Sequence, residues 1–399
     1  MNKIKLTILF TVLIDIIGFG IVIPIMPFYV GSFGAKPFTI TLLFAVFAFF
    51  SFFSGPFLGA LSDRIGRRPI LIISIVSTAI GWLVFAGARS IAMLFAGRII
   101  DGLAAGNIVT AQGYLVDIAK DDKERTTNLG LIGMIFGIGF ILGPMIGGFL
   151  GSISHSFPFW FVGGLATLNA ISAYSFLPET NKNRDRSRPL RFNPFAPIAR
   201  ALTDKRTISG YVVWFLFTIA IALMQSIMAL YLFSVYGYQE FASSLVLSGM
   251  GVVIALNQGL VLKRVWLKYF SEHHLGFWAL LTAAVSFLLM DSQLLAIFII
   301  GLVVMSFSQS LLRVVLTSLA IAEAEPSRKG ETLGVMNSLT SAGMIIGPLI
   351  AGAAFTLWRS LPMLISSVLM LAAFVIATLN RRRLPQVVLP EDPATNAML

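Results

Sequence analysis

Charged side chains inside long apolar stretches are the first candidates for chemistry in this chain. Asp15 and Asp101 lie deep within such stretches, whereas Asp117 and Glu323 lie near the ends of theirs. A charged Asp at the centre of a membrane helix costs about 2.5–3.5 kcal/mol, so a carboxyl group kept there is expected to be neutralised, paired or used. Because scarce water penalises the ionised form, we predict that Asp15 binds and releases a proton. The alternative is a protonated Asp15 that only bonds a backbone carbonyl of its own kinked helix.

Two arginines are embedded in apolar sequence as well. Arg98 precedes Asp101 by three positions, so the two side chains share one face of a helix and can form an internal pair. Mutual neutralisation for membrane insertion would by itself explain that pair. Arg313 has no acid within four positions along the chain. It is therefore expected to face a central cavity, to counter an acid on another helix, or to contact a substrate.

The composition indicates what surrounds these groups. Of the 399 residues, 57% are hydrophobic and 12% are charged, whereas a soluble globular domain carries roughly a quarter charged residues. Membrane lipid is therefore the expected surrounding. The chain has no cysteine and three histidines, which excludes disulfides, thiolate metal sites and cysteine catalysis. We expect neither a cofactor nor a metal site.

The elements that hold these groups are expected to be transmembrane helices, each of about 20 mostly apolar residues for a hydrocarbon core of about 30 Å. A cleavable signal peptide is the alternative for the first apolar run, but Asp15, Pro24 and Pro27 inside an overlong stretch argue against it. The shortest run is the ninth. The twelve predicted spans cover residues 6–30, 39–61, 70–88, 92–118, 129–150, 159–177, 208–236, 242–262, 275–290, 294–322, 333–357 and 362–379.

A polar, proline-containing break divides the twelve spans into two sets of six. We predict four parts from this division. They are an N-terminal six-helix bundle at residues 1–178, a cytoplasmic linker at 179–207, a C-terminal six-helix bundle at 208–380 and a cytoplasmic tail at 381–399. The prolines of the tail predict disorder there.

The distribution of Lys and Arg predicts the orientation in the membrane. Most of them fall in the loops on the side of the linker, and the loops on the other side hold only Lys36, Arg89 and Arg359. Cytoplasmic loops carry such an excess of positive charge, so we predict a multi-pass protein of a bacterial inner membrane with both termini in the cytoplasm. The same distribution explains the net charge of +11 without nucleic acid as a partner.

The two sets of spans are related by a fixed offset. Gly139 aligns with Gly343 and Gly143 with Gly347, each pair being 204 positions apart. Two parallel six-helix halves, with a substrate site at their interface near the midplane, form a known transporter plan in which the halves rock to alternate access. The offset places Leu267 opposite Asp63, so the charged loop of the first half has no good copy in the second.

Motifs along nearly the whole chain resemble those of the major facilitator superfamily, closest to its twelve-helix drug:proton antiporters and their tetracycline-efflux branch. Asp15 opens a segment similar to the first helix of tetracycline exporters, and Arg98 begins the motif Arg-Ile-Ile-Asp-Gly of the fourth span. The loop between spans two and three matches the pattern G-x-L-x-D-R-x-G-R-R through Gly59, Asp63, Arg64, Gly66, Arg67 and Arg68. The fifth span resembles the antiporter signature through Gly139, Gly143, Pro144, Gly147 and Gly148. The resemblance implies an all-α integral membrane fold of two pseudo-symmetric six-helix bundles.

The resemblance also implies roles for these residues. Asp63 is expected to latch onto the start of span eleven, and Arg67 to pair with Asp117, which together hold the outward-facing state closed at the cytoplasmic side. Arg98 is expected to tune proton binding by a nearby acid. A solvated basic turn would explain the arginines of the loop but not Asp63 or the glycines. For the glycine stripe, tight helix packing is the alternative to a link with antiport.

One departure from the family argues against tetracycline as the substrate, because spans three and nine carry no acid. Polar residues that could face a central cavity are nevertheless present. The apolar wall of such a cavity is expected from Trp214, Phe217, Met224 and Met228. Contacts between helices and lipid exposure are the alternatives for each of these residues. The polar candidates are Asn107, Gln112, Gln225, Tyr231, Gln309 and Arg313.

Taken together, the sequence predicts a proton-coupled antiporter that exports small amphipathic or drug-like molecules and works as a monomer. An ATP-driven pump would need a phosphate-binding loop, and the chain has no Gly-x-x-x-x-Gly-Lys-Ser/Thr motif. An enzyme would need a nucleophile with a base, paired carboxylates or a metal cluster, and no such constellation converges. A carrier on the same fold that runs without protons, or that imports a small metabolite with them, remains the alternative, because a fold does not dictate direction.

Overall fold

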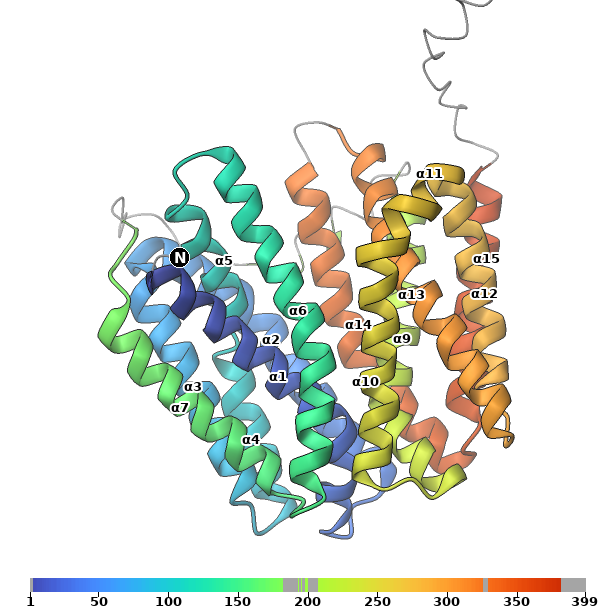
Figure 1. Cartoon of the computed structure of the whole chain (residues 1–399), viewed down its shortest axis with the longest axis horizontal. Helices are drawn as coiled ribbons and strands as arrows, with labels where there is room; N and C mark the ends of the chain where they lie inside the picture. Colours follow the sequence, from blue (N-terminus) through green and yellow to red (C-terminus); the bar gives the residue numbers. More distant parts are fainter. Residues whose placement is uncertain are drawn as a thin grey trace, which may run out of the picture.

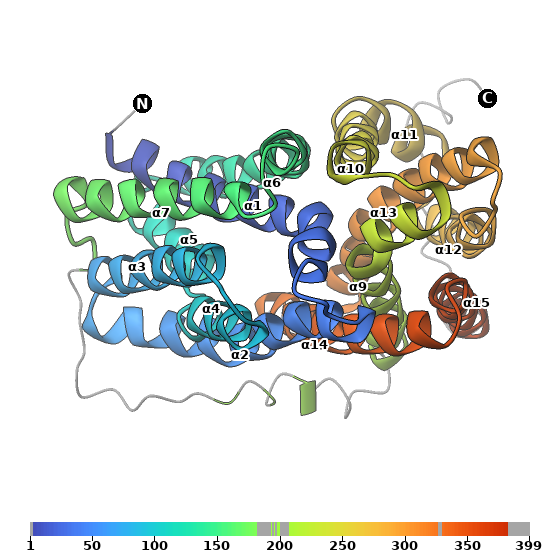
Figure 2. The same cartoon turned by 90° about the horizontal axis from the view of Figure 1, so that it is seen from below.

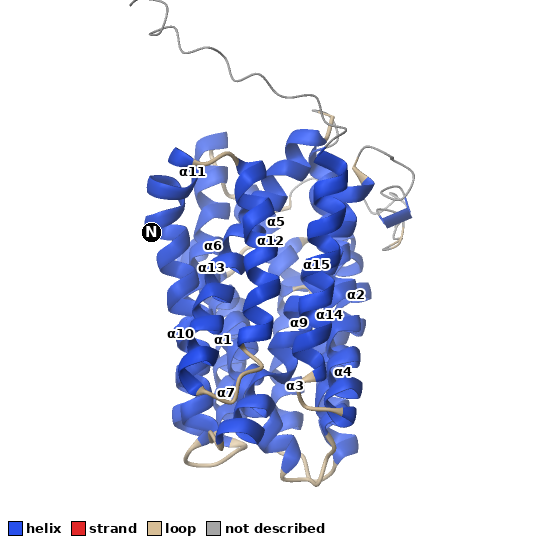
Figure 3. Ribbon diagram, turned by 90° about the vertical axis from the view of Figure 1, so that its right-hand side faces the viewer, coloured by secondary structure: helices blue, strands red, loops and turns tan. Residues whose placement is uncertain are grey.

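The computed structural model describes residues 3–181, 193, 195, 198–199, 207–325 and 329–381 of the chain. These parts are helices joined by short loops, without a strand among the described residues (Figure 3). Most of the predicted linker and residues 382–399 of the predicted tail lie outside the described residues. In a bilayer a helix satisfies its own backbone hydrogen bonds, which explains why long apolar segments adopt this form.

The helices form two bundles side by side (Figure 1). We call the end of the molecule where α7 finishes and α9 begins the linker end, and the opposite end the loop end. The first bundle contains α1 (Lys3–Gly31), α2 (Pro37–Ile65), α3 (Arg67–Ala86), α4 (Ile91–Leu103), α5 (Asn107–Asp117), α6 (Asp122–Gly151) and α7 (Phe157–Phe176). The second contains α9 (Ile208–Tyr236), α10 (Glu240–Leu256), the π-helix η1 (Asn257–Trp266), α11 (Leu267–Tyr269), α12 (Glu272–Leu289), α13 (Leu295–Glu323), α14 (Lys329–Leu357) and α15 (Leu361–Arg381).

The predicted all-α fold with twelve spans is confirmed. Among the described residues, ten helical segments are long and apolar enough to cross a membrane, with α4 and α5 counted together and α10 counted through α11. The two remaining spans are α7 and α12, which are shorter or less apolar. Both belong to the bundles, because α7 packs against α3, and α12 packs against α13 and α15.

The first residues of two pairs of equivalent helices in the two halves are also separated by 204 positions. Helices α4 and α13 begin at Ile91 and Leu295, and α7 and α15 begin at Phe157 and Leu361. The packing is duplicated as well. In the first bundle α6 places a glycine stripe against α1, and in the second bundle α14 places its own glycine stripe against α9. The two halves are therefore two versions of one helix arrangement.

Two spans depart from the predicted continuous helices. The span predicted at residues 92–118 is broken between Leu103 and Asn107, although the sequence has no proline there. Small residues allow α2 to come close at the break, since a Cβ on Gly106 would lie 2.8 Å from the Leu58 Cβ. The Ser54 hydroxyl of α2 donates to the Gly102 carbonyl at 2.6 Å, so a polar side chain satisfies part of the disrupted backbone.

The second departure is in the span predicted at residues 242–262. Its helix continues to Tyr269 and passes through the π-helical segment η1. The Trp266 indole donates to Asn257 Oδ1 at 2.8 Å across this segment. Short π-helical segments commonly accompany functional sites, and η1 contributes Gln258 to the wall of a large cavity between the halves.

The two halves meet at the loop end. On one side of the interface, Gly148 of α6 lies against Ser244 of α10, and the Ser248 hydroxyl donates to the Ile141 carbonyl at 3.1 Å. On the other side, Gly352 of α14 lies against Thr41 of α2. Figure 2 shows both contact regions, α6 beside α10 and α2 beside α14. Toward the linker end α6 and α10 diverge (Figure 1).

Candidate functional site

A network of polar side chains lies inside the first bundle. Asn107 Nδ2 donates to Asp15 Oδ1 at 3.0 Å and to Thr78 Oγ1 at 3.2 Å. Arg98 Nη1 lies 3.2 Å from Asp101 Oδ2, and the Thr78 hydroxyl also hydrogen-bonds the Asp101 side chain. Arg98, Asp101 and Asn107 are 2%, 6% and 4% exposed. Helices α1, α3, α4 and α5 thus converge on one charged cluster, in which Asp15 is partly buried and the other members are buried.

The broken fourth span positions this network. Asp101 lies in the last turn of α4, and Asn107 is the first residue of α5. The guanidinium of Arg98 lies 4.3 Å from the ring centroid of Phe47 and 5.2 Å from that of Trp82. Aromatic faces attract a cation, so these rings supplement the single carboxylate partner of Arg98. No sequence motif marks Thr78, which is one of three hydroxyl residues in its apolar span, with Ser74 and Ser77.

A second charged cluster lies at the linker end, around Arg67. Its guanidinium is 2.6 Å from Asp63 and 3.2 Å from Asp117, and it donates to the Ser62 hydroxyl at 2.7 Å. A Cβ on Gly113 would lie 2.7 Å from the Arg67 guanidinium carbon, so the glycine leaves room for this side chain. The cluster ties α2, α3 and α5 together.

The turn before α3 is stabilised by a glycine within the turn and by a glutamate from beyond α7. Gly66 has φ of 122°, a left-handed conformation that other residues rarely adopt. Glu179, which follows α7, accepts hydrogen bonds from the backbone amides of Arg67 at 2.9 Å and Arg68 at 3.2 Å. Glu179 therefore caps the helix N-terminus, a position where negative charge is favourable. Glu179 falls in the predicted linker, so its sequence position did not identify it as a helix cap.

The remaining loop residues stay within the first bundle. The Asp63 carbonyl accepts a hydrogen bond from Asn181 at 2.6 Å, and Arg68 donates to the Tyr174 carbonyl at 2.8 Å. Gly59 lies against Val109 of α5, and Arg64 lies in the last turn of α2. No contact of Asp63 with the start of α14 is found among the described residues. The latch stays a prediction, which concerns a conformation closed at the linker end.

The glycine stripe of α6 faces two different neighbours. Gly139, Gly143 and Gly147 lie against α1, where a Cβ on Gly143 would be 2.8 Å from the Gly20 Cα. Gly148 instead faces α10 of the other half. Pro144 lies beside Gly20 and also lines the large cavity between the halves. The stripe therefore sets both the packing inside the first bundle and its approach to the second.

The large cavity has a volume of about 400 Å³ and is lined from both halves. Four of the predicted polar residues meet there: Gln112 of α5, Gln225 of α9, and Gln309 and Arg313 of α13. Gln258 is a further polar wall residue that the sequence analysis missed; its polar side chain in an apolar span was the available signal. Apolar walls come from both halves through Phe136, Phe140, Leu247 and Met250.

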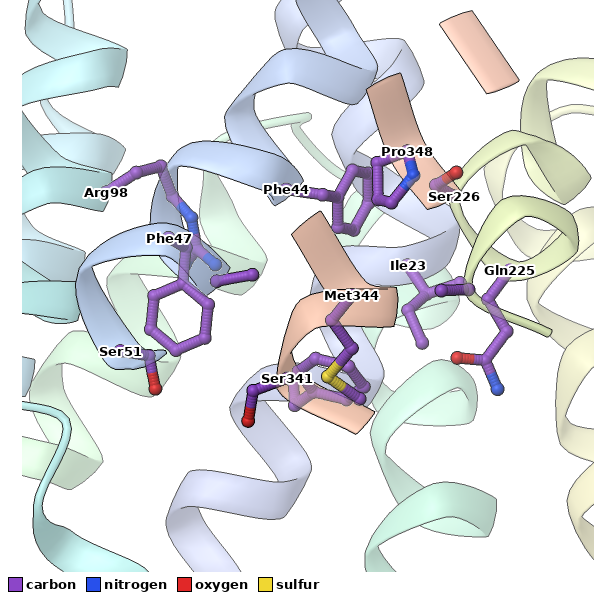
Figure 4. Close-up of a pocket in the computed structure, with 13 residues that line it drawn as sticks. Ile23, Phe44, Phe47, Ser51, Arg98, Gln225, Ser226, Ser341, Met344 and Pro348 are labelled. Atoms are coloured by element: carbon purple, nitrogen blue, oxygen red, sulfur yellow. The ribbon is translucent and has the colours of Figure 1, made fainter. Parts of the chain in front are cut away.

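A smaller cavity of about 70 Å³ lies between α1, α2, α4, α9 and α14. Figure 4 shows Arg98 and Phe47 on one side of it and Met344 and Gln225 on the other. Gln225 lines both cavities. Arg98 therefore connects the buried polar network to the interface between the halves.

Two predicted cavity residues have other surroundings. Asn107 belongs to the polar network of the first bundle. Tyr231 is 1% exposed, its ring stacks on Phe298, and its hydroxyl donates to Asp291 at 3.3 Å near the loop end. Neither residue lines the two cavities described above. The position of Tyr231 depends on which face of α9 turns toward α13, which an almost uniformly apolar helix does not reveal.

Comparison with known proteins places this geometry in a family context. The model of the Major Facilitator Superfamily matches residues 8–276 and 265–397. The chain is 28% identical over 385 residues to the quinolone resistance protein NorA of Staphylococcus aureus (strain COL), covering 96% of this chain and 97% of that protein. It is also 28% identical over 385 residues to the class C tetracycline resistance protein of Escherichia coli, covering 93% and 95%.

Solved structures share the fold. A bacterial homologue of the human lysosomal transporter Spinster, in an inward-facing and unoccupied conformation, superposes with a TM-score of 0.79 at 16% identity, covering 95% of this chain and 96% of that one. The human organic anion transporter MFSD10 (TETRAN) superposes with a TM-score of 0.71 at 22% identity, covering 94% and 99%. At these identities the likeness concerns the fold alone.

Proposed function

Because the chain belongs to the major facilitator superfamily, we propose that this multi-pass membrane transporter is a proton-coupled antiporter that exports small amphipathic or drug-like molecules. Its similarity to proteins named for quinolone and tetracycline resistance supports export of such molecules. The cavity between the two halves of a single chain supports function as a monomer. Family membership makes it a transporter rather than an enzyme.

The observation that carries the proposal is the buried network of Asp15, Asn107, Thr78, Asp101 and Arg98. Two carboxylates and one guanidinium leave one negative charge, and a single bound proton makes the cluster neutral. An uncompensated charge is costly in the interior, so the network favours one exchangeable proton shared between two interacting carboxyl groups. Its location deep within apolar helices is typical of proton relays in transporters.

Coupling to cargo is expected to pass through Arg98. Protonation of Asp101 removes the charge that holds the Arg98 guanidinium at 3.2 Å. Because Arg98 also lines the smaller cavity, its rearrangement would alter the wall that the two halves share. Proton binding and cargo binding can then favour different arrangements of the halves, which is the requirement for coupled transport.

The conformation fits one stage of alternating access. The halves contact one another at the loop end, and α6 and α10 diverge toward the linker end (Figure 1). The excess of Lys and Arg at the linker end supports a cytoplasmic location for it. We therefore assign this conformation as inward-facing, in a bacterial inner membrane. The Arg67 cluster would meet α14 only after the halves rock to close the cytoplasmic side.

Reconstituted vesicles test the proposal. The purified protein is placed in liposomes that contain a pH-sensitive dye, and a quinolone is added outside without a pH gradient. Antiport predicts that quinolone entry drives protons out, so the lumen becomes alkaline beyond the signal of empty liposomes. Asp15→Asn should abolish this signal. Acidification of the lumen would indicate symport, and entry without any proton movement would indicate a uniporter; either result would refute the proposal.

A further inference from the structure

We propose that the exported molecule carries an anionic group, such as a carboxylate, that binds Arg313 in the large cavity. This inference rests on the proposed export function and names the class of its substrate. Of the residues that line the cavity, Arg313 is the one with a charged side chain, and no Asp or Glu lines it within the described part of the chain. The smaller cavity likewise contains Arg98 and no carboxylate side chain in its described wall.

Arg313 lies far from the end of its helix. It precedes Glu323, the last residue of α13, by ten positions, which corresponds to about 15 Å along the helix axis. Its side chain is exposed to the cavity, and no ion pair or side-chain hydrogen bond of its guanidinium is found among the described residues. Arg98 provides the contrast, because it is 2% exposed and paired with Asp101.

The fold itself does not require a cation at this position. The residue 204 positions earlier, in the matching helix α5, is Val109. An apolar side chain therefore occupies the equivalent place in the other half. A cation in the middle of a membrane bundle is costly and typically marks a substrate or ion pathway. We therefore assign Arg313 a role in the cavity and not in helix packing.

The groups around Arg313 match an amphipathic anion. The planar guanidinium can donate two parallel hydrogen bonds to a carboxylate, and such charge-assisted bonds are about twice as strong as neutral ones. Gln258 and Gln309 add neutral amide donors nearby, while Phe136 and Phe140 form an apolar wall for a ring system. A cationic molecule would instead meet a like charge with no carboxylate to offset it.

An anionic cargo has an electrical consequence. When an anion leaves the cell and one proton enters, two elementary charges move in the same direction across the membrane. An inside-negative potential therefore drives the cycle. One-for-one exchange of a monovalent cation for a proton would move no net charge. The sign and size of the transport current consequently report the charge of the cargo.

Three fluorescent probes with one ring system test the inference by equilibrium binding to the purified protein. Dansylglycine carries a carboxylate, dansylglycinamide is its neutral amide, and dansylethylenediamine carries an ammonium group. We expect the protein to bind dansylglycine at least about tenfold more tightly than the ammonium probe, as expected for hydrogen bonds to a charged group. Arg313→Gln should weaken dansylglycine binding by about 10- to 100-fold and change amide binding by less than about twofold, while Arg313→Lys should retain part of the preference.

Arg359→Gln is the matched control, because it removes the same charge from the loop between α14 and α15, outside the cavity. It should leave all three affinities unchanged. Absence of dansylglycine binding, equal binding of the three probes, or an equal loss of all three in a folded Arg313→Gln protein would overturn the inference. A carboxylate preference that depends on Arg313, without proton movement in vesicles, would refute antiport and leave the inference standing. Proton movement driven equally by all three probes would support antiport and refute the inference that the substrate is anionic.

Discussion

The two halves of the molecule share their packing and differ in their charge. Gly143 of α6 packs against Gly20 of α1, and Gly347 of α14 packs against Ala222 of α9. A Cβ atom added to Gly143 would lie 2.8 Å from the Gly20 Cα, and one added to Gly347 would lie 2.8 Å from the Ala222 Cβ. The offset of 204 residues relates both the helices and these glycines. In the second half the same offset places apolar residues opposite the buried charges of the first: Ile219 opposite Asp15, Leu302 opposite Arg98 and Met305 opposite Asp101.

This difference separates what the fold needs from what the function needs. Because α13 forms with apolar residues opposite Arg98 and Asp101, the helix arrangement does not depend on the charges. Their presence in the first half is consistent with the proton binding proposed above. The second half has its own unmatched charge, Arg313, which faces the cavity. We propose that the first half binds the proton and the second half recognises the cargo.

The largest predicted effect comes from breaking the buried pair. Arg98→Leu leaves Asp101 buried without its counter-charge, which should lower stability by about 3–5 kcal/mol. The double variant Arg98→Leu/Asp101→Met copies Leu302 and Met305 of the second half. It should recover most of that stability and still fail to couple protons. Thermal unfolding of the purified proteins measures the difference.

The double variant is the informative one for the comparison between halves. Recovery would show that the charges are dispensable for folding, as their absence from α13 indicates. A double variant as unstable as Arg98→Leu alone would contradict this account. It would mean that the surroundings of α4, including Phe47 and Trp82, require the guanidinium itself.

A smaller and symmetric effect is predicted for the shared glycines. Gly143→Ala and Gly347→Ala each add a methyl group where a neighbouring helix leaves no room, and each should cost about 1–3 kcal/mol. Gly130→Ala and Gly334→Ala are matched controls on the same two helices, because a Cβ there meets nothing within 4 Å. The controls should be neutral or slightly stabilising, since Ala favours helix over Gly by about 1 kcal/mol. If only one of the two substitutions, Gly143→Ala or Gly347→Ala, lowered the stability, the two glycine stripes would not pack equivalently.

The smallest effect concerns helix caps. The N-terminus of α3 uses Glu179 from beyond α7, whereas its counterpart α12 uses its own Ser271, whose hydroxyl accepts from the His274 amide at 3.4 Å. Glu179→Ala and Ser271→Ala should each lower stability by about 1 kcal/mol. Only Glu179→Ala should also raise hydrogen exchange at the end of α7, because only this cap joins two helices. Equal exchange changes in both variants would refute the joining role.

Several features of the fold could be predicted from the sequence because they depend on local spacing. Hydrophobic runs gave the twelve spans, the fixed offset gave the duplication, and the structure contains the Arg98–Asp101 pair that a three-residue spacing predicts. The break in the fourth span was not predictable from apolarity, since Ala104 and Ala105 are as apolar as their neighbours. The Ser54 hydroxyl that donates at this break belongs to another helix, so the local sequence does not reveal the contact.

Contacts between helices account for most of what the sequence could not supply. The bond between Asn107 and Asp15 requires a particular rotation of α5 relative to α1, and apolar faces on all sides leave that rotation undetermined. The capping by Glu179 similarly depends on where α7 ends relative to α3. In a membrane the hydrophobic pattern marks depth more clearly than it marks the inward face, because lipid and protein interior are both apolar.

Proton release on cargo binding tests the central claim most directly. Purified protein in weakly buffered detergent solution is mixed with dansylglycine, whose carboxylate does not titrate near neutral pH, while a pH indicator records released protons. If the network holds one exchangeable proton that cargo binding displaces, the protein should release about one proton per molecule, and Asp15→Asn should release none while still binding the probe. Binding without release by the unaltered protein, or undiminished release by Asp15→Asn, would contradict the account.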